Sequence, residues 1–264
     1  FYLIVRKLSF LNCRVFVEVP SYPYDLEYRK YSILTLFDKF FRTKMSPYVT
    51  AFSYYGSEVD GIFGRPAIKL ENGVSSGDFP IVNLNQSSKL LSLIGVANIS
   101  FWHGYDRLIK SLGGLSKDDR KKFTLTLVGV GPELKKLKDL VSHYQLAESV
   151  NFVGLKNGIE LDTIFDRANI AVSSLGLHRI NQESITPLKP AEYAARGLPF
   201  VAAGGNATFV YKVSSDEEMI DLMDLYNWYF SNKFDSVAIR CFAESNLSWE
   251  AQMLKIKEYI ERAD

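Results

Sequence analysis

This chain lacks most of the features that mark specialised classes of protein. Its two cysteines, Cys13 and Cys241, lie too far apart to indicate a disulfide framework or a metal-binding knuckle. It has no apolar run of the ~20 residues that a membrane span requires, and no signal-peptide cleavage pattern. A net charge of +1 gives no support for a nucleic-acid partner. These absences favour a globular protein of a reducing, cytoplasmic compartment.

Several catalytic signatures are also missing. The sequence has no P-loop, no Ser-His-Asp arrangement and no zinc-ligand spacing, so no metal site is expected. Its 264 residues are 47% hydrophobic and 23% charged, which suits one large domain or two modest ones. The first residue is not methionine, and the apolar segment 1–10 is typical of the middle of a helix. We therefore expect the natural protein to be longer at its N-terminus.

The second part of the chain alternates regularly between predicted strands and predicted helices. Strands followed by helices of about ten residues indicate βαβ units, a parallel sheet and right-handed crossovers, and therefore an α/β fold. The strands are expected at 90–97, 123–128, 150–153, 170–175, 199–203 and, more weakly, 209–213, with helices at 105–112, 133–144, 161–168 and 191–196. Earlier segments are strands at 14–19, 48–54 and 67–70, a helix at 31–44 and a linker rich in Ser, Asn and Gly at 75–88. Three helices close the chain at 216–230, 234–244 and 249–262.

The most informative segment is Leu188–Val201, LKPAEYAARGLPFV. It predicts a short helix, a glycine stop and a buried strand, with Pro190 suited to the first helical turn. The preceding strand leads into it through His178 and Arg179, so polar residues collect where a strand ends and a helix begins. Open α/β sheets bind ligands at that edge, and helix N-termini favour anions. We therefore expect a site for a phosphorylated ligand.

Two more loops follow neighbouring predicted strands. Residues 129–133, GVGPE, have glycines that allow close backbone approach, but not the third glycine of a dinucleotide fingerprint. Residues 98–104, NISFWHG, place His103 at a helix start, where the dipole disfavours a charged imidazole unless an anion is near. Two interpretations stay open for each. The GVGP turn contacts ligand or is only a tight turn, and His103 contacts ligand or is a capping or surface histidine.

Two glutamates, Glu183 and Glu192, flank the exit of the strand at 170–175. A glutamate in a first helical turn often only complements the helix dipole. Carboxylates also suit vicinal hydroxyls, because both oxygens accept hydrogen bonds. The acid pair of a hydrolase is the rival interpretation. An ion pair that held Glu192 away from any ligand would count against a binding role.

Taken together, these segments resemble the nucleotide-sugar-dependent glycosyltransferases of family 4, also called group 1, which have a two-domain GT-B architecture. The resemblance covers roughly residues 14–262 and is carried by IGVANISFWHGYDRLIKSL, LTLVGVGPELKKL, VNFVGLKNGIELDTIFDRANIAVSSLGLHR and LKPAEYAARGLPFV. It implies a GT-B-like α/β fold with a complete C-terminal Rossmann-like domain at 78–247 that binds the nucleotide sugar. Residues 1–77 would be the remainder of an N-terminal Rossmann-like, acceptor-side domain, and residues 248–264 a closing helix that crosses back toward it.

The resemblance also implies roles for single residues. Glu192 would hold the ribose hydroxyls, and backbone amides around Leu188 and Lys189 would meet the diphosphate. The catalytic residues it implies are Glu183, which would hold sugar hydroxyls or face the developing positive charge, His103, which would stabilise the leaving diphosphate with Lys189 or Arg179, and His178, near the sugar. The donor-binding residues are expected to be Asn98, Gly129, Gly131, Val153, Gly154, Leu155, Arg179, Leu188, Lys189 and Glu192. The donor would be UDP- or GDP-linked, with no cofactor and no metal.

Three features depart from the family pattern. The usual loop G-R-L-x-x-x-K-G supplies Arg and Lys to the diphosphate, whereas Asn98 and His103 stand at the matching places here, which predicts weaker or pH-dependent donor binding. Eight residues separate Glu183 from Glu192 where the family has seven, so either the loop has one extra residue or Ser184 takes the first position. The early N-terminal strands, a glycine-rich loop and an acceptor-side histidine have no match, which predicts little turnover by this chain alone.

The leading hypothesis is a retaining glycosyltransferase that moves a hexose from a nucleoside-diphosphate sugar to a glycan or lipid-linked acceptor in surface polysaccharide biosynthesis. The expected location is the cytoplasm, with peripheral association at the inner face of the membrane. A sugar-nucleotide epimerase of the same architecture is one alternative, since fold does not determine chemistry. A non-catalytic nucleotide-sugar-binding subunit is the other.

Overall fold

The computed structural model describes residues 1–264 except 24–32, 57, 181–187, 206, 215–218 and 263–264. The described chain divides into two compact units. Unit 1 comprises the chain up to Gly73 together with the residues from Trp249 onward, and unit 2 comprises the described residues between Val74 and Ser248. The C-terminal segment thus returns to the unit that contains the N-terminus.

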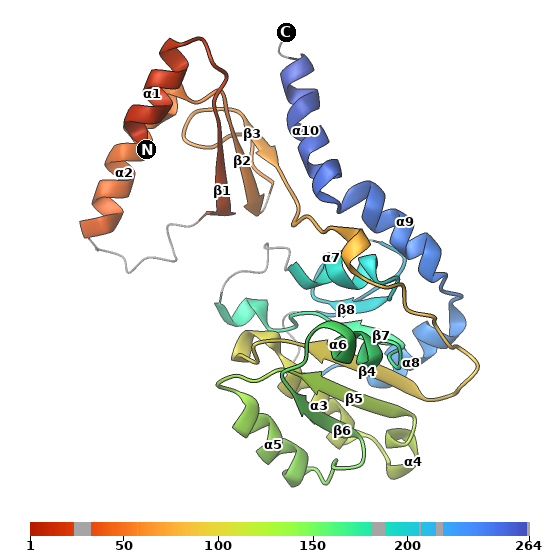
Figure 1. Cartoon of the computed structure of the whole chain (residues 1–264). Helices are drawn as coiled ribbons and strands as arrows, with labels where there is room; N and C mark the ends of the chain where they lie inside the picture. Colours follow the sequence, from red (N-terminus) through yellow and green to blue (C-terminus); the bar gives the residue numbers. More distant parts are fainter. Residues whose placement is uncertain (24–32, 57, 181–187, 206, 215–218, 263–264) are drawn as a thin grey trace. The chain divides into compact units, whose positions relative to one another are not determined.

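Unit 2 is built on a sheet of six parallel strands in the order β6-β5-β4-β7-β8-β9 (Figure 1). The predicted parallel α/β fold is therefore confirmed. The strands are β4 (Leu91–Val96), β5 (Phe123–Val128), β6 (Val150–Gly154), β7 (Ile170–Val172), β8 (Phe200–Ala202) and β9 (Val210–Lys212).

Helices cover both faces of this sheet, because side chains that alternate along the strands enter two separate cores. Leu93, Leu125 and Leu127 pack with three helices on one face, α3 (Tyr105–Gly114), α5 (Leu134–His143) and α8 (Leu222–Ser231). Ile94 and Val128 pack on the opposite face with α6 (Gly158–Phe165), α7 (Leu188–Ala195) and α9 (Ser236–Asn246). Strands buried on both faces are typical of a parallel sheet. The remaining elements of unit 2 are α4 (Lys117–Arg120) and the short 3-10 helices η2 (Ser76–Asp78), η3 (Phe101–His103) and η4 (Leu177–Ile180).

The predicted helix–stop–strand order of the segment from Leu188 onward is confirmed. Pro190 lies in the first turn of α7, where its missing N–H costs no helical hydrogen bond. Gly197 adopts a left-handed φ of +74° directly after the helix. The Gly197 N–H donates to Ala194 O (2.9 Å) and the Leu198 N–H donates to Tyr193 O (2.9 Å), which closes the last turn before β8 begins.

Some predicted boundaries were wrong. The strand expected at 170–175 ends at Val172, because the chain turns there and the Leu175 N–H donates to His103 O. The helix expected at 161–168 begins earlier, at Gly158. The segment 75–88, expected as a linker, packs on unit 2: the Val82 N–H donates to Arg196 O (2.8 Å), and Gln86 Nε2 donates to Asn232 O (3.0 Å).

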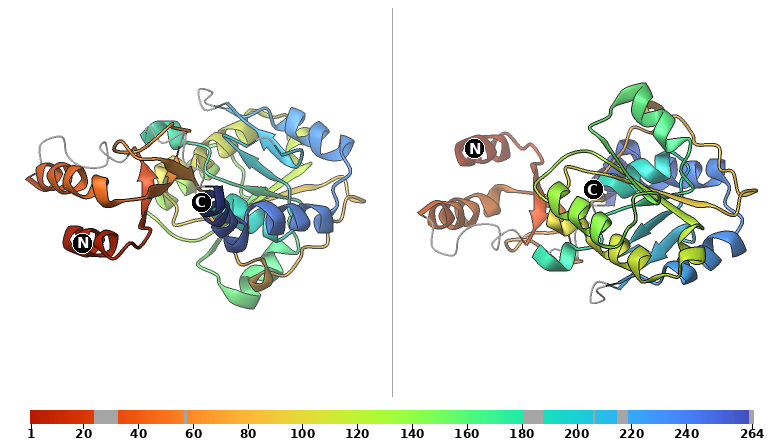
Figure 2. Two further views of the ribbon diagram at one scale, coloured as in Figure 1. Left: turned by 90° about the horizontal axis from the view of Figure 1, so that it is seen from above. Right: turned by 90° about the horizontal axis from the view of Figure 1, so that it is seen from below.

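Unit 1 contains a three-stranded parallel sheet in the order β1-β2-β3. Its elements are α1 (Tyr2–Phe10), β1 (Phe16–Tyr22), α2 (Ile33–Met45), η1 (Ser46–Tyr48), β2 (Ala51–Gly56), β3 (Ala67–Lys69) and α10 (Trp249–Arg262). Helices α1 and α2 lie side by side (Figures 1 and 2). Helix α10 packs on the sheet, where Tyr259 meets Phe16 edge-on with ring centroids 6.1 Å apart. The buried Gln252 of α10 also accepts a hydrogen bond from the Glu71 N–H (2.8 Å).

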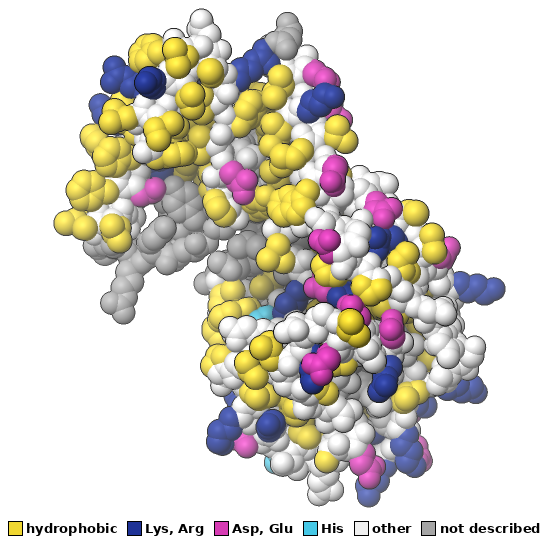
Figure 3. All heavy atoms as spheres, viewed as in Figure 1, with side chains coloured by type: hydrophobic (Ala, Val, Ile, Leu, Met, Phe, Trp, Pro, Cys, Tyr) yellow, Lys and Arg dark blue, Asp and Glu magenta, His cyan; other side chains and the backbone are white. Residues whose placement is uncertain are grey.

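Apolar side chains gather on the surface of α1 and α2 (Figure 3). Leu3, Ile4, Leu34 and Phe37 are each more than half exposed. Patches of this kind usually mark interaction sites.

The buried Asn169 ties β4 to the preceding segment at the amino edge of the unit 2 sheet. Its Oδ1 accepts from the Ser92 N–H (2.8 Å), and its Nδ2 donates to Asn85 O (3.2 Å). We expect Asn169→Ala to lower the free energy of unfolding by about 2 kcal/mol, because it removes two hydrogen bonds that a buried side chain makes to the backbone, each contributing about 1 kcal/mol. Urea denaturation measures this change. Asn151→Ala, at an exposed position on β6, is the control, and an equal loss in both variants would contradict the assignment.

Candidate functional site

The strand order of unit 2 creates a topological switch point between β4 and β7. These strands are neighbours, but the chain continues from β4 to β5 on one side and from β7 to β8 on the other. In open α/β sheets, ligands bind at the carboxyl ends of the strands where the order reverses in this way. Residues 97–104 follow β4 and residues 173–180 follow β7, so the candidate site is built from these two connections.

The two connections are joined through their backbones. The Leu175 N–H donates to His103 O (3.0 Å), and the Gly176 N–H donates to Trp102 O (3.1 Å). The η3 and η4 turns therefore hold each other in place, and the side chains they carry have a defined position.

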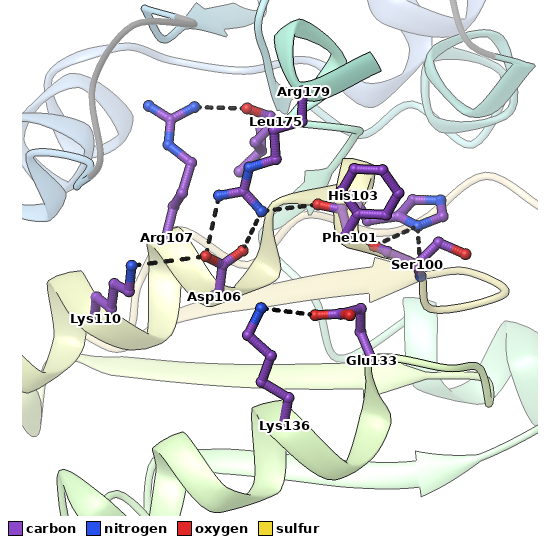
Figure 4. Close-up of polar contacts among 10 residues, drawn as sticks. All are labelled: Ser100, Phe101, His103, Asp106, Arg107, Lys110, Glu133, Lys136, Leu175 and Arg179. Carbon is purple, nitrogen blue, oxygen red and sulfur yellow. Dashed lines mark hydrogen bonds and ion pairs between the residues drawn. The ribbon is translucent and has the colours of Figure 1, made fainter.

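An ion pair strengthens this junction (Figure 4). Arg179 of η4 donates to both carboxylate oxygens of Asp106 (2.8 and 3.0 Å) and to Phe101 O (2.8 Å). Burial alone would raise the pKa of Asp106, but the hydrogen bonds and the charge of Arg179 outweigh it and leave the pKa below its usual value. Arg179, expected to bind donor, thus has a structural task, and its role toward a donor stays a prediction.

His103 is buried in η3, where its Nδ1 lies 3.0 Å from the Ser100 N–H and 3.2 Å from the Ser100 carbonyl oxygen. Because a backbone N–H only donates, we assign Nδ1 as the acceptor and place the proton of the neutral ring on Nε2. The ring stacks on Tyr105 at 5.7 Å between centroids. Burial, the largest effect, and the positive charge of Lys189 together lower the pKa of His103 to about 4, against the opposing effect of the Ser100 carbonyl. The capping interpretation is confirmed, because His103 accepts from the N-cap N–H of Ser100 in a capping box, while a surface position is excluded by its burial and contact with a ligand stays a prediction.

The first turn of α7 brings Lys189 to the same place. Its Nζ is buried and has no hydrogen-bond partner among the residues that the structure describes. Burial lowers the pKa of Lys189 to about 8, although the charge of Glu192 raises it. The side chain of Leu188 is exposed.

Glu192 is partly engaged in an ion pair with Arg196. Its Oε1 accepts from Arg196 Nε (2.9 Å), and Arg196 also donates through Nη1 to Asp162 Oδ1 (2.7 Å). Arg196 is only 3% exposed, whereas the Glu192 side chain is 26% exposed. No described residue donates a hydrogen bond to the other carboxylate oxygen, Oε2. The ion pair counts against the ribose role but leaves one oxygen free, so that role stays a prediction.

Four buried polar atoms beside the switch point lack a partner among the described residues. They are Tyr105 OH, Ser173 Oγ, His178 Nδ1 and Lys189 Nζ. Buried polar atoms are normally hydrogen-bonded, and a group of unsatisfied ones indicates a place where water or a ligand binds. The structure thus brings together the predicted residues His103, His178, Lys189 and Glu192.

The two glycines of the GVGP turn are needed for backbone packing. Gly129 has φ +123°, and a Cβ there would overlap the carbonyl oxygen of Ala97. A Cβ on Gly131 would overlap the backbone of Ile99. The turn therefore rests directly on the connection that follows β4. Contact with a ligand stays a prediction.

The remaining predicted residues lie farther from the switch point or outside the described chain. Asn98 is exposed in the connection after β4. Val153, Gly154 and Leu155 lie at the end of β6, two strands away from β4; Gly154 O accepts from the Gly129 N–H (2.7 Å), and Leu155 is 71% exposed. Glu183 and the alternative Ser184 fall in 181–187, outside the described residues.

Sequence reasoning missed Asp106, Ser173, Arg196 and Asp162. Asp106 in a first helical turn has the pattern of simple dipole complementation, and its partner lies 73 residues away. Ser173 follows an apolar strand without a motif. Only Glu192 and Arg196 had a local signal, the i, i+4 spacing of a helical ion pair.

Comparison with known protein families identifies relatives of this chain. The family of glycosyl transferases group 1 matches residues 81–214, just over half of the chain. The chain belongs to this family. A protein of Methanocaldococcus jannaschii that carries the name uncharacterized glycosyltransferase MJ1069 is 23% identical over 216 residues, which are 73% of this chain and 55% of that protein. The chain thus spans about half the length of this relative.

Two solved structures share the fold. HepE from Anabaena, in complex with UDP, aligns with a TM-score of 0.70 at 12% identity and covers 99% of this chain and 76% of its own. The lipopolysaccharide outer core galactosyltransferase WaaB aligns with a TM-score of 0.66 at 13% identity, over 100% of this chain and 79% of that one. These similarities confirm the GT-B-like, Rossmann-like fold that the sequence resemblance implied.

No described helix combines the length and the apolar character needed to cross a membrane. The described residues also include no group of three or more His, Cys, Asp and Glu side chains placed to hold a metal ion.

The buried neutral His103 predicts an acid-dependent loss of stability. Its pKa is about 4 in the folded chain and 6.5 in the unfolded one, so the unfolded state binds more protons between these values. Stability should therefore fall as pH drops from about 6.5 toward 4, by about 2 kcal/mol after allowance for solvent screening. His103→Gln should remove this part of the pH dependence in urea denaturation. His143→Gln, at an exposed position on α5, is the control, and identical profiles for both variants would contradict the prediction.

Proposed function

We propose that this protein is a retaining glycosyltransferase that transfers a hexose from a UDP- or GDP-linked donor to a glycan or lipid-linked acceptor. Membership of the group 1 family supports the class of reaction. The observation that carries the proposal is the set of unsatisfied polar groups at the switch point, next to the start of α7. The buried ammonium group of Lys189 and the backbone N–H groups at the start of α7 lie there, and both suit a diphosphate.

Structural neighbours support a nucleotide-sugar donor. HepE from Anabaena has been solved with UDP and with UDP and glucose. By this analogy unit 2 is the donor domain, and the connections after β4, β5 and β6 lie along the donor. Unit 1 is the remainder of the acceptor-side domain, joined by the closing helix α10.

The residue roles that we propose are those implied by the family resemblance. Lys189 and the N–H groups at the start of α7 meet the diphosphate, together with His103. Glu192 binds the ribose hydroxyls with the oxygen that Arg196 leaves free. His178 lies near the sugar, and Glu183 holds its hydroxyls or faces the developing positive charge. Charge develops on the leaving diphosphate during transfer, so groups already fixed there lower the barrier.

The proposed setting is surface polysaccharide assembly at the cytoplasmic face of a membrane. The direct test is incubation of the protein with UDP- and GDP-sugars, with and without lipid-linked acceptors, followed by measurement of nucleotide release and product formation. Transfer to an acceptor supports the proposal. An epimerised sugar nucleotide in the NMR spectrum, formed without acceptor, would indicate the epimerase instead. Donor binding without hydrolysis or transfer would indicate a binding subunit.

Glu192 offers a sharper test of the donor site. We expect Glu192→Gln to weaken binding of the cognate nucleoside diphosphate by about tenfold or more, because hydrogen bonds to a charged group contribute roughly 1.5–3 kcal/mol. Calorimetry measures the affinity. The loss should disappear with the 2′,3′-dideoxy nucleotide, since the partner hydroxyls are then absent from both complexes.

Asp162→Asn is the matched control for this variant. Asp162 and Glu192 bond the same guanidinium, so both variants disturb Arg196, but only Glu192 is proposed to touch ribose. Equal losses of affinity in the two variants would show that Glu192 acts only through Arg196, and the ribose assignment would be wrong.

A further inference from the structure

The arginines and lysines around the switch point of unit 2 are mostly already engaged. Arg179 is bound to Asp106 on both sides of its guanidinium. Arg107 is fully buried and donates to Leu175 O (2.6 Å) and Ser214 O (2.7 Å). Lys110 lies 3.8 Å from the Asp106 carboxylate (Figure 4). The connection at 97–104 has no lysine or arginine at all.

Lys189 differs from these cations. Its Nζ is buried, yet no described residue accepts a hydrogen bond from it. A buried ammonium group without partners is costly, and an anionic ligand removes that cost. The nearest described carboxylate on its own helix, Glu192, already accepts a hydrogen bond from Arg196.

His103 is a second polar group at this edge of the sheet. With Nδ1 assigned as the acceptor from the Ser100 N–H, Nε2 carries the proton. His103 lies in η3 after β4, and Lys189 lies in the first turn of α7 between the neighbouring strands β7 and β8; the charge of Lys189 also lowers the pKa of the imidazole. A neutral N–H beside one ammonium group offers an anion two donors with a single positive charge.

We propose that Lys189 supplies the positive charge that binds the donor diphosphate in this chain, with His103 Nε2–H as its neutral companion, and that binding takes up a proton in mildly alkaline solution. The inference rests on the proposed function, because it takes the ligand to be a nucleoside diphosphate. It assigns the charge to α7, whereas the family pattern places it in the connection after β4.

Proton uptake follows from the burial of Lys189. Burial lowers its pKa to about 8 in the free protein, and a bound diphosphate raises that pKa again. A diphosphate is fully ionised above pH 7, because its last pKa is about 6. Above pH 8 the free protein therefore loses the ammonium proton and must regain it on binding. With a charged fraction near one-tenth at pH 9, affinity should be about tenfold lower than at pH 7.

Several other ionisable groups surround α7. Glu192 is on the same helix, and α9 contributes Arg240, which donates to Ala195 O (2.7 Å) and pairs with Glu244. Strand β8 has no ionisable side chain. The remaining groups that face this region are His103, Tyr105, Asp162, His178, Tyr193 and Arg196.

The experiment measures binding of UDP, GDP, uridine and guanosine by calorimetry from pH 7 to 9. Lys189→Met should weaken binding of the cognate diphosphate by about 10- to 100-fold at pH 7 and leave the nucleoside unaffected. Lys189→Arg should bind with little dependence on pH, since its charge persists. Lys121→Met removes one exposed charge at the amino edge of the sheet and should change nothing. Proton uptake by the unaltered protein is measured at pH 8.5 in buffers of different ionisation enthalpy.

The outcomes distinguish a failure of the proposed function from a failure of the inference about Lys189. If the unaltered protein binds neither diphosphate, the proposed function fails and the inference fails with it. If it binds one, but Lys189→Met binds equally well, the inference is wrong and the proposed function stands. If that variant does not fold, proton uptake by the unaltered protein at pH 8.5 decides: about three-quarters of a proton supports the inference, and none overturns it.

Discussion

The parallel pairing of β4 with β7 is the constraint on which the candidate site depends. It places Leu93 beside Ile170 and Gly95 beside Val172, so the connections after these strands leave the sheet at the same edge. The η3 and η4 turns then bond through their backbones, and the Arg179–Asp106 ion pair spans them. Helix α7 follows the same edge and brings Lys189 within electrostatic reach of His103. The positions of His103 and His178 depend on this junction, because they lie on the η3 and η4 turns.

Charged groups at this edge divide into structural and unsatisfied ones. The planar guanidinium groups of Arg179 and Arg196 each satisfy several acceptors at once, which suits arginine to fixed internal contacts. Lysine is a point charge on a flexible stem, and the buried Lys189 has no such contacts among the described residues. The arginines are engaged in structural contacts, while Lys189 and His103 are the groups that we propose for a ligand.

Much of the fold could be predicted from the sequence, because local patterns determine it. Buried strands such as Phe123–Val128 are short apolar runs, and Gly197 ends α7 as its position indicated. The family segments likewise identified the edge of the sheet that carries the site. The Arg179–Asp106 pair could not be predicted, because it joins residues 73 apart with no local pattern. The same holds for the burial of His103 and Lys189, which depends on how η3, η4 and α7 pack together.

The comparisons show the family and the fold of this chain, whereas the reaction depends on the groups at the β4–β7 edge. Group 1 family membership rests on residues 81–214, whereas the distant solved structures show only the shared architecture. The reaction must therefore be argued from the groups at the β4–β7 edge. These groups suit an anion beside a polyhydroxyl ligand, as a nucleotide sugar provides.

A crystal structure of the protein with its cognate nucleoside diphosphate tests this account most directly. The account predicts diphosphate oxygens within hydrogen-bond distance of Lys189 Nζ and His103 Nε2, with the Arg179–Asp106 pair intact. A diphosphate bound instead by Arg179 released from Asp106, or bound away from the start of α7, would contradict it.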